Sequence, residues 1–529
     1  MKTRTHYLLA LLALAFLPGC EQKSTGDTPG KNIPGNAIRI ISGSENKILE
    51  PILQEWSKKS GVPVAVDYRG SVEIMQALQG ENEYDAAWPA NSLWIDLSGN
   101  KAVRHASSIT RTPVVIAIKQ SKAKELGLKG PMLKIADLVR LARDKKLRLL
   151  MSNPTQSNSG AMGYFGFLHS LNGKEDALTS KDLDNPALRE QAKTLLSAIT
   201  RSSNSSGWIK DLYVQDPDSF DAMVNYEALV IEANQELTAK NREPLLVFYP
   251  SEGQPIADSP LAFISKPSNA SKEQPFLSLQ QHLLSPEVQA RLLQSGRRTG
   301  LVGAEASGEA FKKEWGILPD KILQPIPLPD PETIRKAIDV YLTALKKPSL
   351  TVFVIDFSGS MAGQGEAQTK KAVEMLFTDE AKRHFLQAGP SDITVIVPFD
   401  NNPRASLRAN GADPAELAKV VGFVNQNRAG GGTDIYGGAM EGLRQITRIP
   451  DRDKYQTSVV LMTDGVSDGS FEELKAAWQQ SGSNIPIFPI MFGNADPSQL
   501  QQIADLTRSK VFDGRKNMVD AFKNAKSFN

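Results

Sequence analysis

Short apolar runs alternate with amphipathic segments of helical periodicity through the middle of the chain, residues 36–325. Ala37–Ile41, Val62–Tyr68 and Tyr84–Trp88 are predicted strands, and turns that carry serine follow each of them. Helical segments come next in each case, as in Val72–Leu78. A repeated order of strand, turn and helix is typical of a parallel sheet whose helix N-termini face one crevice. We therefore expect the α/β class for this region.

The same alternation returns in residues 348–529. Leu350–Ile355 is an apolar run of the kind that forms a strand buried on both faces, and Ser458–Met462 is another. The remaining elements predicted here are the strands Ile393–Phe399 and Ile485–Met491 and the helices Pro414–Asn427, Ile435–Ile446 and Phe471–Gln480. This pattern predicts a second α/β unit with a doubly wound sheet.

Oxygen-bearing side chains follow the first strand of this last unit. Asp356, Ser358 and Ser360 come directly after the predicted strand Leu350–Ile355, with a spacing of two residues. Open α/β sheets bind ligands beyond the carboxyl ends of their strands. Hard cations such as Mg²⁺ prefer oxygen ligands in near-octahedral order. The sequence therefore predicts a divalent cation at this edge of the sheet.

Two more oxygen donors occur downstream. Thr433 follows the glycine-rich segment 430–432, and Asp464 follows the strand Ser458–Met462. The five positions resemble the metal-ion-dependent adhesion site of von Willebrand factor A (VWA) domains, with its D-x-S-x-S pattern, then T, then D. The resemblance covers about residues 348–529 and implies a doubly wound, Rossmann-like fold.

That resemblance also implies roles for the five residues. Ser358 and Ser360 would ligate Mg²⁺ (or Mn²⁺ or Ca²⁺) directly, and Thr433 directly or through water. Asp356 and Asp464 would act largely through water, so the ion keeps positive character towards a sixth position. A Glu or Asp of a protein partner would fill that position. The alternative is that these Ser and Thr residues only cap helices and turns. Asp400 and Asp434 lie outside the pattern, and we interpret them as turn and cap residues.

Residues 36–325 resemble periplasmic solute-binding proteins of the type II, two-lobed class. Four segments carry most of the resemblance: a strand crossing to the second lobe, a ligand loop, a later pocket strand and a return crossing, at Arg111–Ile118, Ser152–Gly160, Asn225–Glu232 and Tyr249–Gly253. The candidate pocket residues are Ser44, Ser71, Asn91, Ser157 and Tyr226.

Hydroxyl groups and backbone N–H groups at helix starts favour an anion or another polar solute. Glu45 and Glu73 stand beside this cradle and would repel an oxyanion if they faced inward. The alternative for both is ordinary complementation of the helix dipole in the first turn. Capping without a ligand is the alternative for the serines, and the region would then serve as an interaction module.

The N-terminus has the layout of a secretory signal peptide. A basic start, Met1–Arg4, precedes the apolar run Tyr7–Leu17, which is too short to span a bilayer as a helix. Cys20 is the chain's one cysteine and follows Leu-Pro-Gly, which resembles a bacterial lipoprotein box. We expect residues 1–19 to be removed, Cys20 to carry acyl chains and residues 20–35 to be a flexible linker. The alternative is an ordinary cleaved signal with a stray cysteine.

A proline-rich segment, Pro325–Pro331, separates the two large units and is expected to be stiff and extended. Glu332–Lys346 is a predicted amphipathic helix, with Ile334, Ile338, Tyr341, Leu342 and Leu345 on one stripe. We assign residues 326–347 to this linker and helix, and expect the stripe to pack at the junction of the domains.

Composition narrows the classes of function. With 61 basic and 59 acidic residues the net charge is +2, so nothing suggests nucleic acid as a partner. Five histidines and one cysteine make a His/Cys zinc site improbable. No nucleophile elbow, zinc spacing or phosphate loop is found, so we do not expect an enzyme.

We expect a binding protein of the bacterial cell envelope, lipid-anchored and facing the periplasm or exterior. Its metal site would capture an acidic residue of a partner, and its solute-binding-like region would sense or dock. The alternative is the substrate-binding receptor of an ABC-type transport system.

Overall fold

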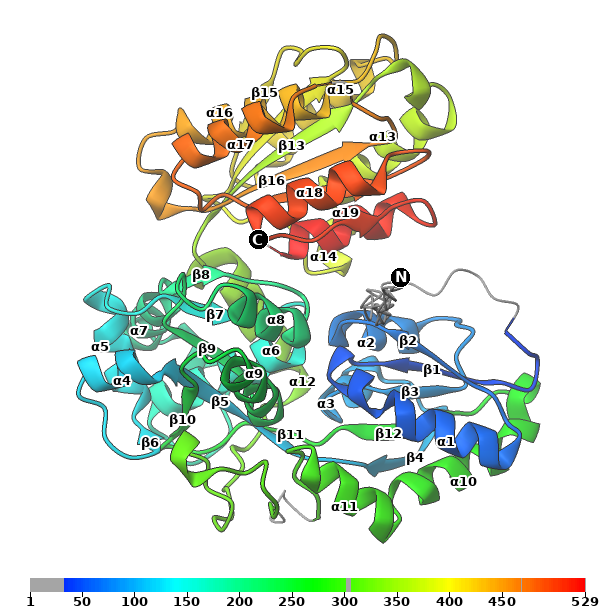
Figure 1. The fold of residues 1–529 in the computed structure, drawn as a ribbon, viewed down its shortest axis with the longest axis vertical. Coiled ribbons are helices and arrows are strands. Elements are labelled where there is room, and N and C mark those ends of the chain that lie inside the picture. Colours follow the sequence, from blue (N-terminus) through cyan, green and yellow to red (C-terminus); the bar gives the residue numbers. More distant parts are fainter. Residues whose placement is uncertain (1–32, 301–305, 468, 529) are drawn as a thin grey trace, which may run out of the picture.

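The computed structural model describes residues 33–300, 306–467 and 469–528, and within them the chain forms three β-sheets (Figure 1). The predicted signal peptide, Cys20 and most of the linker 20–35 lie outside the described residues. No helix among the described residues has both the length and the apolar character needed to cross a membrane.

The first sheet belongs to the lobe that we call lobe 1. Its strand order is β2-β1-β3-β12-β4, and the first three strands in this order are parallel. The strands are β1 (Ile38–Ser42), β2 (Val64–Tyr68), β3 (Ala86–Trp88), β4 (Val103–Ser108) and β12 (Pro260–Ile264). The helical segments are η1 (Ser44–Leu49), α1 (Glu50–Ser60), α2 (Ser71–Gln79), α3 (Leu93–Ser98), α10 (Glu273–Leu283) and α11 (Pro286–Gln294).

The second sheet belongs to lobe 2. The chain enters it through β5 (Thr112–Lys119) directly after β4, returns to lobe 1 through β12, and crosses to lobe 2 again after α11, so three crossings join the lobes. Its other strands are β6 (Met132–Leu133), β7 (Leu149–Met151), β8 (Ile199–Arg201), β9 (Ala222–Tyr226), β10 (Leu245–Pro250) and β11 (Ile256–Ala257). The helices are α4 (Gln120–Glu125), α5 (Ile135–Arg143), α6 (Asn158–Asn172), α7 (Pro186–Leu196), α8 (Ser206–Gln215) and α9 (Glu227–Ala239). The expected two-lobed α/β arrangement is confirmed.

One predicted element of lobe 2 is wrong. The segment Asn225–Glu232 was expected to be a strand, but β9 ends at Tyr226 and α9 begins at Glu227. Nearly all of this segment is buried. A short buried apolar run has no periodicity that separates strand from helix. The helix in fact continues to Ala239, beyond the length of an ordinary strand.

The predicted junction helix is part of lobe 2. It forms as α12 (Pro331–Val340), capped by Asp330, and ends in a π-helical turn, η6 (Tyr341–Leu345). All five residues of its apolar stripe are buried in the same cluster as the core of lobe 2. The Tyr164 hydroxyl of α6 donates a hydrogen bond to the Ala337 carbonyl over 2.9 Å. The stripe therefore completes the core of lobe 2 instead of lying between two finished domains.

The third sheet has the strand order β15-β14-β13-β16-β17-β18, and only β15 is antiparallel to its neighbour. The strands are β13 (Ser349–Asp356), β14 (Ile393–Phe399), β15 (Leu407–Asn410), β16 (Gln456–Thr463), β17 (Ile487–Met491) and β18 (Phe512–Asp513). One face packs on α13 (Gln364–Leu376), α15 (Pro414–Gln426) and α19 (Met518–Ser527). The other face packs on α16 (Ile435–Thr447), α17 (Phe471–Gln480) and α18 (Pro497–Thr507). A short helix, α14 (Glu380–Arg383), follows α13.

This topology fixes where a ligand can bind. After β13 the chain adds β14 on one side, and it later returns to add β16 on the other. The loops after β13 and β16 therefore leave towards opposite faces and open a crevice at the carboxyl edge of the sheet. Asp356 ends β13, and Asp464 follows β16 directly. The predicted metal residues lie at this edge, which we call the metal edge.

Candidate metal centre and solute cleft

Asp356 is the fixed point of the metal edge. It is fully buried, and its carboxylate accepts a hydrogen bond from the Ser358 backbone N–H at 2.7 Å. Its other oxygen accepts a hydrogen bond from the Thr463 hydroxyl at 2.5 Å. Two donors, one beyond the end of β13 and one at the end of β16, therefore orient the carboxylate.

The hydroxyls form a chain that leads from this carboxylate to the second one. Ser358 Oγ lies 3.1 Å from Ser360 Oγ, and Ser360 Oγ donates to Asp464 Oδ1 over 2.6 Å. Ser358 is buried whereas Ser360 is exposed. The row of oxygens thus runs from the interior to the surface, where a ligand from another molecule has access.

Thr433 is held against this row by the backbone of its loop. The Gly430 N–H donates to the Phe357 carbonyl at 2.8 Å, and the Gly359 N–H donates to the Gly431 carbonyl at 2.9 Å. On the other side, a Cβ at Gly465 would stand 2.7 Å from Thr433 Oγ1. The structure therefore brings all five predicted residues together, and glycine at 465 is required for the close approach of the last two loops.

The electrostatics of the edge fit a cation. Burial raises the pKa of Asp356, and the negative charge of Asp464 raises it further. Burial also raises the pKa of Asp464. A nearby cation favours the charged form of a buried carboxylate, so both side chains would be stabilised by an ion at this edge. Three hydroxyls and two carboxylates are also a donor set suited to Mg²⁺, Mn²⁺ or Ca²⁺.

The other acidic residues of this region have structural roles, as we interpreted them. Asp434 caps α16, since its Oδ1 accepts the Gly437 N–H at 2.9 Å. Asp400 forms an ion pair with Arg404 at 2.9 Å. Among the described residues, at this edge or away from it, no group of three or more His, Cys, Asp or Glu side chains is placed to hold a metal, so the donor set of the edge depends on hydroxyls.

Two supporting residues were missed by the sequence analysis. Thr463 orients Asp356, and Arg404 donates to the carbonyls of Phe357 and Gly430 at 3.2 and 3.3 Å. The position of Thr463 beside the pattern's last aspartate was a usable signal. Arg404 lies in an irregular loop, and its position in the sequence gives no such signal.

The predicted solute cleft lies where the two lobes touch. Ser44 Oγ of lobe 1 lies 3.3 Å from Ser205 Oγ of lobe 2. Trp94 of lobe 1 donates through Nε1 to Asn158 Oδ1 of lobe 2 at 2.7 Å, and Asn158 in turn donates to the Tyr226 hydroxyl at 2.9 Å. Of the five candidates, Ser44 and Tyr226 therefore belong to the contact across the cleft.

The other three candidates are buried near the same region. Asn91 donates to the Ile256 carbonyl at 3.0 Å and accepts the Leu93 N–H at 2.9 Å, so the fold uses its side chain. Ser157 is the N-cap residue of α6, but its side chain does not make the capping bond. Ser71 is the first residue of α2 and is buried.

The two glutamates beside the cleft behave differently. Glu73 accepts the Gly70 N–H at 3.0 Å, which matches the alternative of a capping carboxylate. Glu45 folds back over Gly43, where a Cβ would meet its Oε1 at 2.1 Å. That Oε1 is buried and has no hydrogen-bond partner. Burial raises the pKa of Glu45 to about 7, and the Glu45 charge in turn raises the pKa of Tyr226.

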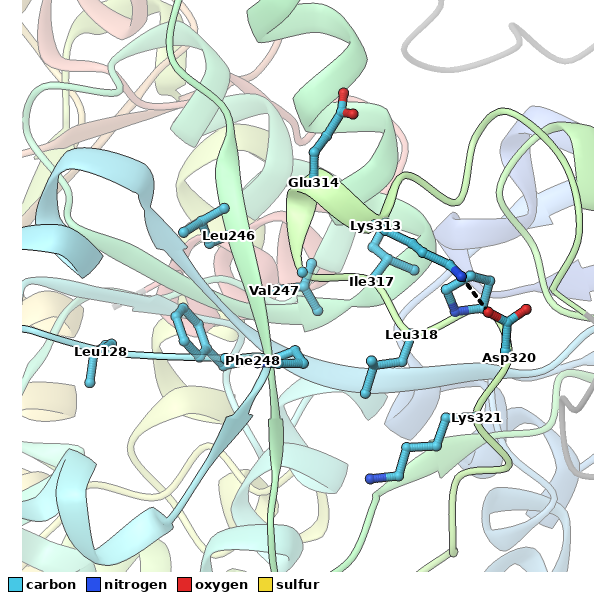
Figure 2. Close-up of a pocket in the computed structure, with 14 residues that line it drawn as sticks. Leu128, Leu246, Val247, Phe248, Lys313, Glu314, Ile317, Leu318, Asp320 and Lys321 are labelled. Atoms are coloured by element: carbon cyan, nitrogen blue, oxygen red, sulfur yellow. Dashed lines mark ion pairs between the residues drawn. The ribbon is translucent and has the colours of Figure 1, made fainter.

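A separate cavity of about 500 Å³ lies on lobe 2, away from both candidate sites (Figure 2). Its wall is apolar and includes Leu128, Leu246 and Phe248. Lys313 and Asp320 pair at 2.6 Å on its rim, as Figure 2 shows. No motif or periodicity in the sequence marks this cavity.

The protein is thus an α/β chain with two regions, the two-lobed region and the domain that carries the metal edge. Residues 38–298 match the family of bacterial extracellular solute-binding proteins, and residues 351–525 match the von Willebrand factor type A domain. The chain therefore combines a solute-binding-protein region with a C-terminal VWA domain.

Curated relatives match the VWA part of the chain. Inter-alpha-trypsin inhibitor heavy chain H3 of Pongo abelii is 30% identical over 159 residues, which are 28% of this chain and 17% of that protein. The heavy chain H1 of Bos taurus is 28% identical over 154 residues, 27% of this chain and 16% of that protein. The chain thus spans only 17% of the length of the first of these relatives.

Solved structures resemble each region. A ferric binding protein from Campylobacter jejuni is 15% identical with a TM-score of 0.43, over 57% of this chain and 98% of that one. A von Willebrand factor type A structure from Catenulispora acidiphila is 22% identical with a TM-score of 0.29, over 35% of this chain and 43% of that one.

Proposed function

We propose that this protein is an extracytoplasmic binding protein whose VWA domain captures an acidic side chain of a protein partner through a bound divalent cation. The observation that carries the proposal is the convergence of Asp356, Ser358, Ser360, Thr433 and Asp464 from three loops at one edge of the sheet. Mg²⁺ or a similar ion would supply a positive charge and an open coordination position for the partner's carboxylate.

The orientation of the VWA domain supports capture of an external partner. The chain leaves lobe 2 through η6 and enters β13 at its amino end, so this end of the sheet faces the lobes (Figure 1). At roughly 3.3 Å per residue, the strand carries the metal edge about 25 Å away from that end. Together with the exposed Ser360, this distance gives a large partner access to the ion.

The remaining parts of the proposal follow from the sequence. Lipid attached to Cys20, which lies outside the described residues, would anchor the chain to a membrane of the bacterial envelope. The role proposed for the two-lobed region is sensing or docking. We propose capture without turnover, because the hydroxyl and carboxylate oxygens of this site suit the holding of an ion.

A second candidate function is that of a receptor for a transport system, with the two lobes closing on a solute. The match of residues 38–298 to solute-binding proteins favours it. Glu45, which folds back over Gly43, opposes an oxyanion as that solute at pH values where its carboxyl group is ionised, since like charges repel at close range. A transport receptor should bind its solute with the same affinity in the presence and in the absence of a metal chelator.

The test compares metal uptake and partner capture in the same protein. Titration calorimetry of the full chain with Mg²⁺ and Mn²⁺ should give one site, and affinity capture from membranes should yield proteins that chelator elutes. Asp356→Ala should abolish both effects. Asp505→Ala, which removes an exposed carboxylate from α18, is the matched control and should retain both.

Ser360→Ala provides an independent check, because this exposed residue can be changed without disturbing the core. It should weaken metal uptake, and thermal unfolding of the metal-free protein verifies that the variant is folded. Metal uptake that is the same in Asp356→Ala, Ser360→Ala and the wild type would refute the proposed function.

A further inference from the structure

The VWA domain is fixed to lobe 2 by a broad contact. The Trp208 ring of lobe 2 meets the Phe528 ring edge-on with centroids 4.9 Å apart. Arg508 of the VWA domain pairs with Asp216 of lobe 2 at 2.9 Å. Further hydrogen bonds of lobe 2 join Arg201 to the Arg508 carbonyl at 2.9 Å and Asn204 to Asn524 at 2.7 Å. Aromatic packing and ion pairing together make this a firm attachment.

Lobe 1 meets the VWA domain through a different and smaller contact, which is centred on Gln76. Gln76 Nε2 donates to the Arg383 carbonyl at 2.9 Å, and Gln76 Oε1 lies 3.1 Å from His384 Nδ1. One amide group of α2 thus binds two consecutive residues, Arg383 at the end of α14 and His384 directly after it. We call residues 383–385 the clamp segment.

The clamp segment also binds lobe 2. Gln156 Nε2 donates to the His384 carbonyl at 2.9 Å, and Thr155 Oγ1 donates to the Phe385 carbonyl at 3.4 Å. Both residues belong to the predicted ligand loop Ser152–Gly160. Three consecutive residues of the VWA domain therefore bind one rim of each lobe at the same time.

The lobes are in direct contact beside the clamp segment. A Cβ on Gly70, at the start of α2 in lobe 1, would stand 2.7 Å from the Gln156 carbonyl of lobe 2. A cavity of about 240 Å³ lies beside the clamp segment, where the lobes and the VWA domain meet. Residues of all three bodies line it, among them Arg69, Glu73 and Lys523.

We propose that the VWA domain is carried by lobe 2 and clamps lobe 1 in the closed position through Gln76. Gln76 and Gln156 reach the same segment only while the lobes are closed. Opening of the lobes and release of the clamp are therefore one equilibrium, and any ligand that favours one favours the other to the same degree. This coupling involves the two lobes and the clamp segment, and it does not depend on an ion at the metal edge.

The test places a wedge between the lobes and measures the clamp segment. Gly70→Ala adds a methyl group against the Gln156 carbonyl, and the negative φ of Gly70 allows alanine. Hydrogen exchange of the full chain, followed by mass spectrometry, should show peptides over residues 380–388 exchanging about fivefold faster, because loss of hydrogen bonds of this kind is worth about 1 kcal/mol. Gly80→Ala is the matched control, since a Cβ there meets nothing within 4 Å.

A second variant tests the same equilibrium from the opposite side. Gln76→Ala removes both bonds to the clamp segment and should speed exchange about fivefold in the loops around Ser44 and Ser205. Among the described residues, no hydrogen bond joins the Gln76 side chain to these loops. Gln54→Ala, an exposed residue of α1, is its control. Thermal unfolding verifies that each variant is folded.

The two variants together test whether closure of the lobes and binding of the clamp segment are coupled. Faster exchange at the distant segment in both variants supports the clamp. If Gln76→Ala changes only peptides that contain its own contacts, the lobes close independently of the VWA domain and the inference is wrong. That result would leave Mg²⁺ uptake and partner capture untouched, so it is distinguishable from failure of the proposed function.

Discussion

Glu45 offers the sharpest test of the electrostatics of the cleft. Its Oε1 is buried without a hydrogen-bond partner, and burial raises the pKa of the side chain from 4.5 to about 7. Glu45→Gln keeps the shape of the side chain and removes its ability to ionise. The variant should therefore be more stable than the wild type wherever the wild-type residue is charged.

The magnitude and its sign follow from linkage. Between pH 4.5 and pH 7 the folded protein keeps a proton that the unfolded chain has lost, so the stability of the wild type falls as the pH rises. One pKa unit corresponds to about 1.4 kcal/mol, so the shift of Glu45 amounts to about 3 kcal/mol at most. The advantage of Glu45→Gln should be near zero at pH 4.5, grow steadily and level off above pH 7.

The assay is urea unfolding of both proteins at a series of pH values, with hydrogen exchange of peptides from β1–β3 reporting lobe 1 separately. Glu287→Gln, on the exposed surface of α11, is the control and should show no growing advantage. A difference between Glu45→Gln and the wild type that stays constant from pH 4.5 to pH 8 would refute a buried, charge-disfavouring site.

Three further predictions concern the metal edge and the domain contact. Gly465→Ala should weaken Mg²⁺ uptake in calorimetry at least tenfold, since its methyl group would displace the Thr433 hydroxyl, 2.7 Å away. Thr463→Val should lower the free energy of unfolding by about 1–3 kcal/mol, measured in urea, and weaken Mg²⁺ uptake, because Asp356 loses a buried hydrogen bond. Trp208→Ala should loosen the VWA domain from lobe 2, which faster hydrogen exchange at the C-terminal end of α19 would report.

Each of these predictions has an outcome that contradicts it. Gly422→Ala is the control for Gly465→Ala, since a Cβ at Gly422 meets nothing within 4 Å, and it should leave Mg²⁺ uptake unchanged. If Gly465→Ala and Gly422→Ala bind Mg²⁺ with equal affinity, the close approach of Gly465 to Thr433 does not matter for the ion. Unaltered unfolding of Thr463→Val would mean that its bond to Asp356 contributes nothing. If hydrogen exchange in α19 is the same in Trp208→Ala and the wild type, the Trp208–Phe528 contact does not hold the VWA domain to lobe 2.

The metal edge could be predicted from the sequence because its geometry follows from strand ends. Asp356 and Asp464 come at the carboxyl ends of two apolar runs, and parallel neighbours bring such ends to one edge. Thr433 needed the additional resemblance, because only the hydrogen bonds of its glycine loop to Phe357 and Gly359 bring it there.

The clamp could not be predicted in the same way. Gln76 is one of many polar residues on an amphipathic helix, and its partners lie more than 300 positions away in the sequence. Neither periodicity nor a motif marks such a contact, since it depends on how finished domains lie against each other. The helix α9 was missed for a local reason, because a fully buried segment lacks the polar positions that reveal a period.

The seating of α12 and η6 in lobe 2 bears on how this chain can be divided. A truncation that stops at the prolines before residue 331 would strip Tyr164 of its hydrogen-bond acceptor and leave the inner layer of lobe 2 open to water. The natural joint between the two modules lies after Leu345, where the backbone becomes extended. Chimeras that exchange the C-terminal module should therefore be spliced at residues 346–348, with the helix kept on the solute-binding side.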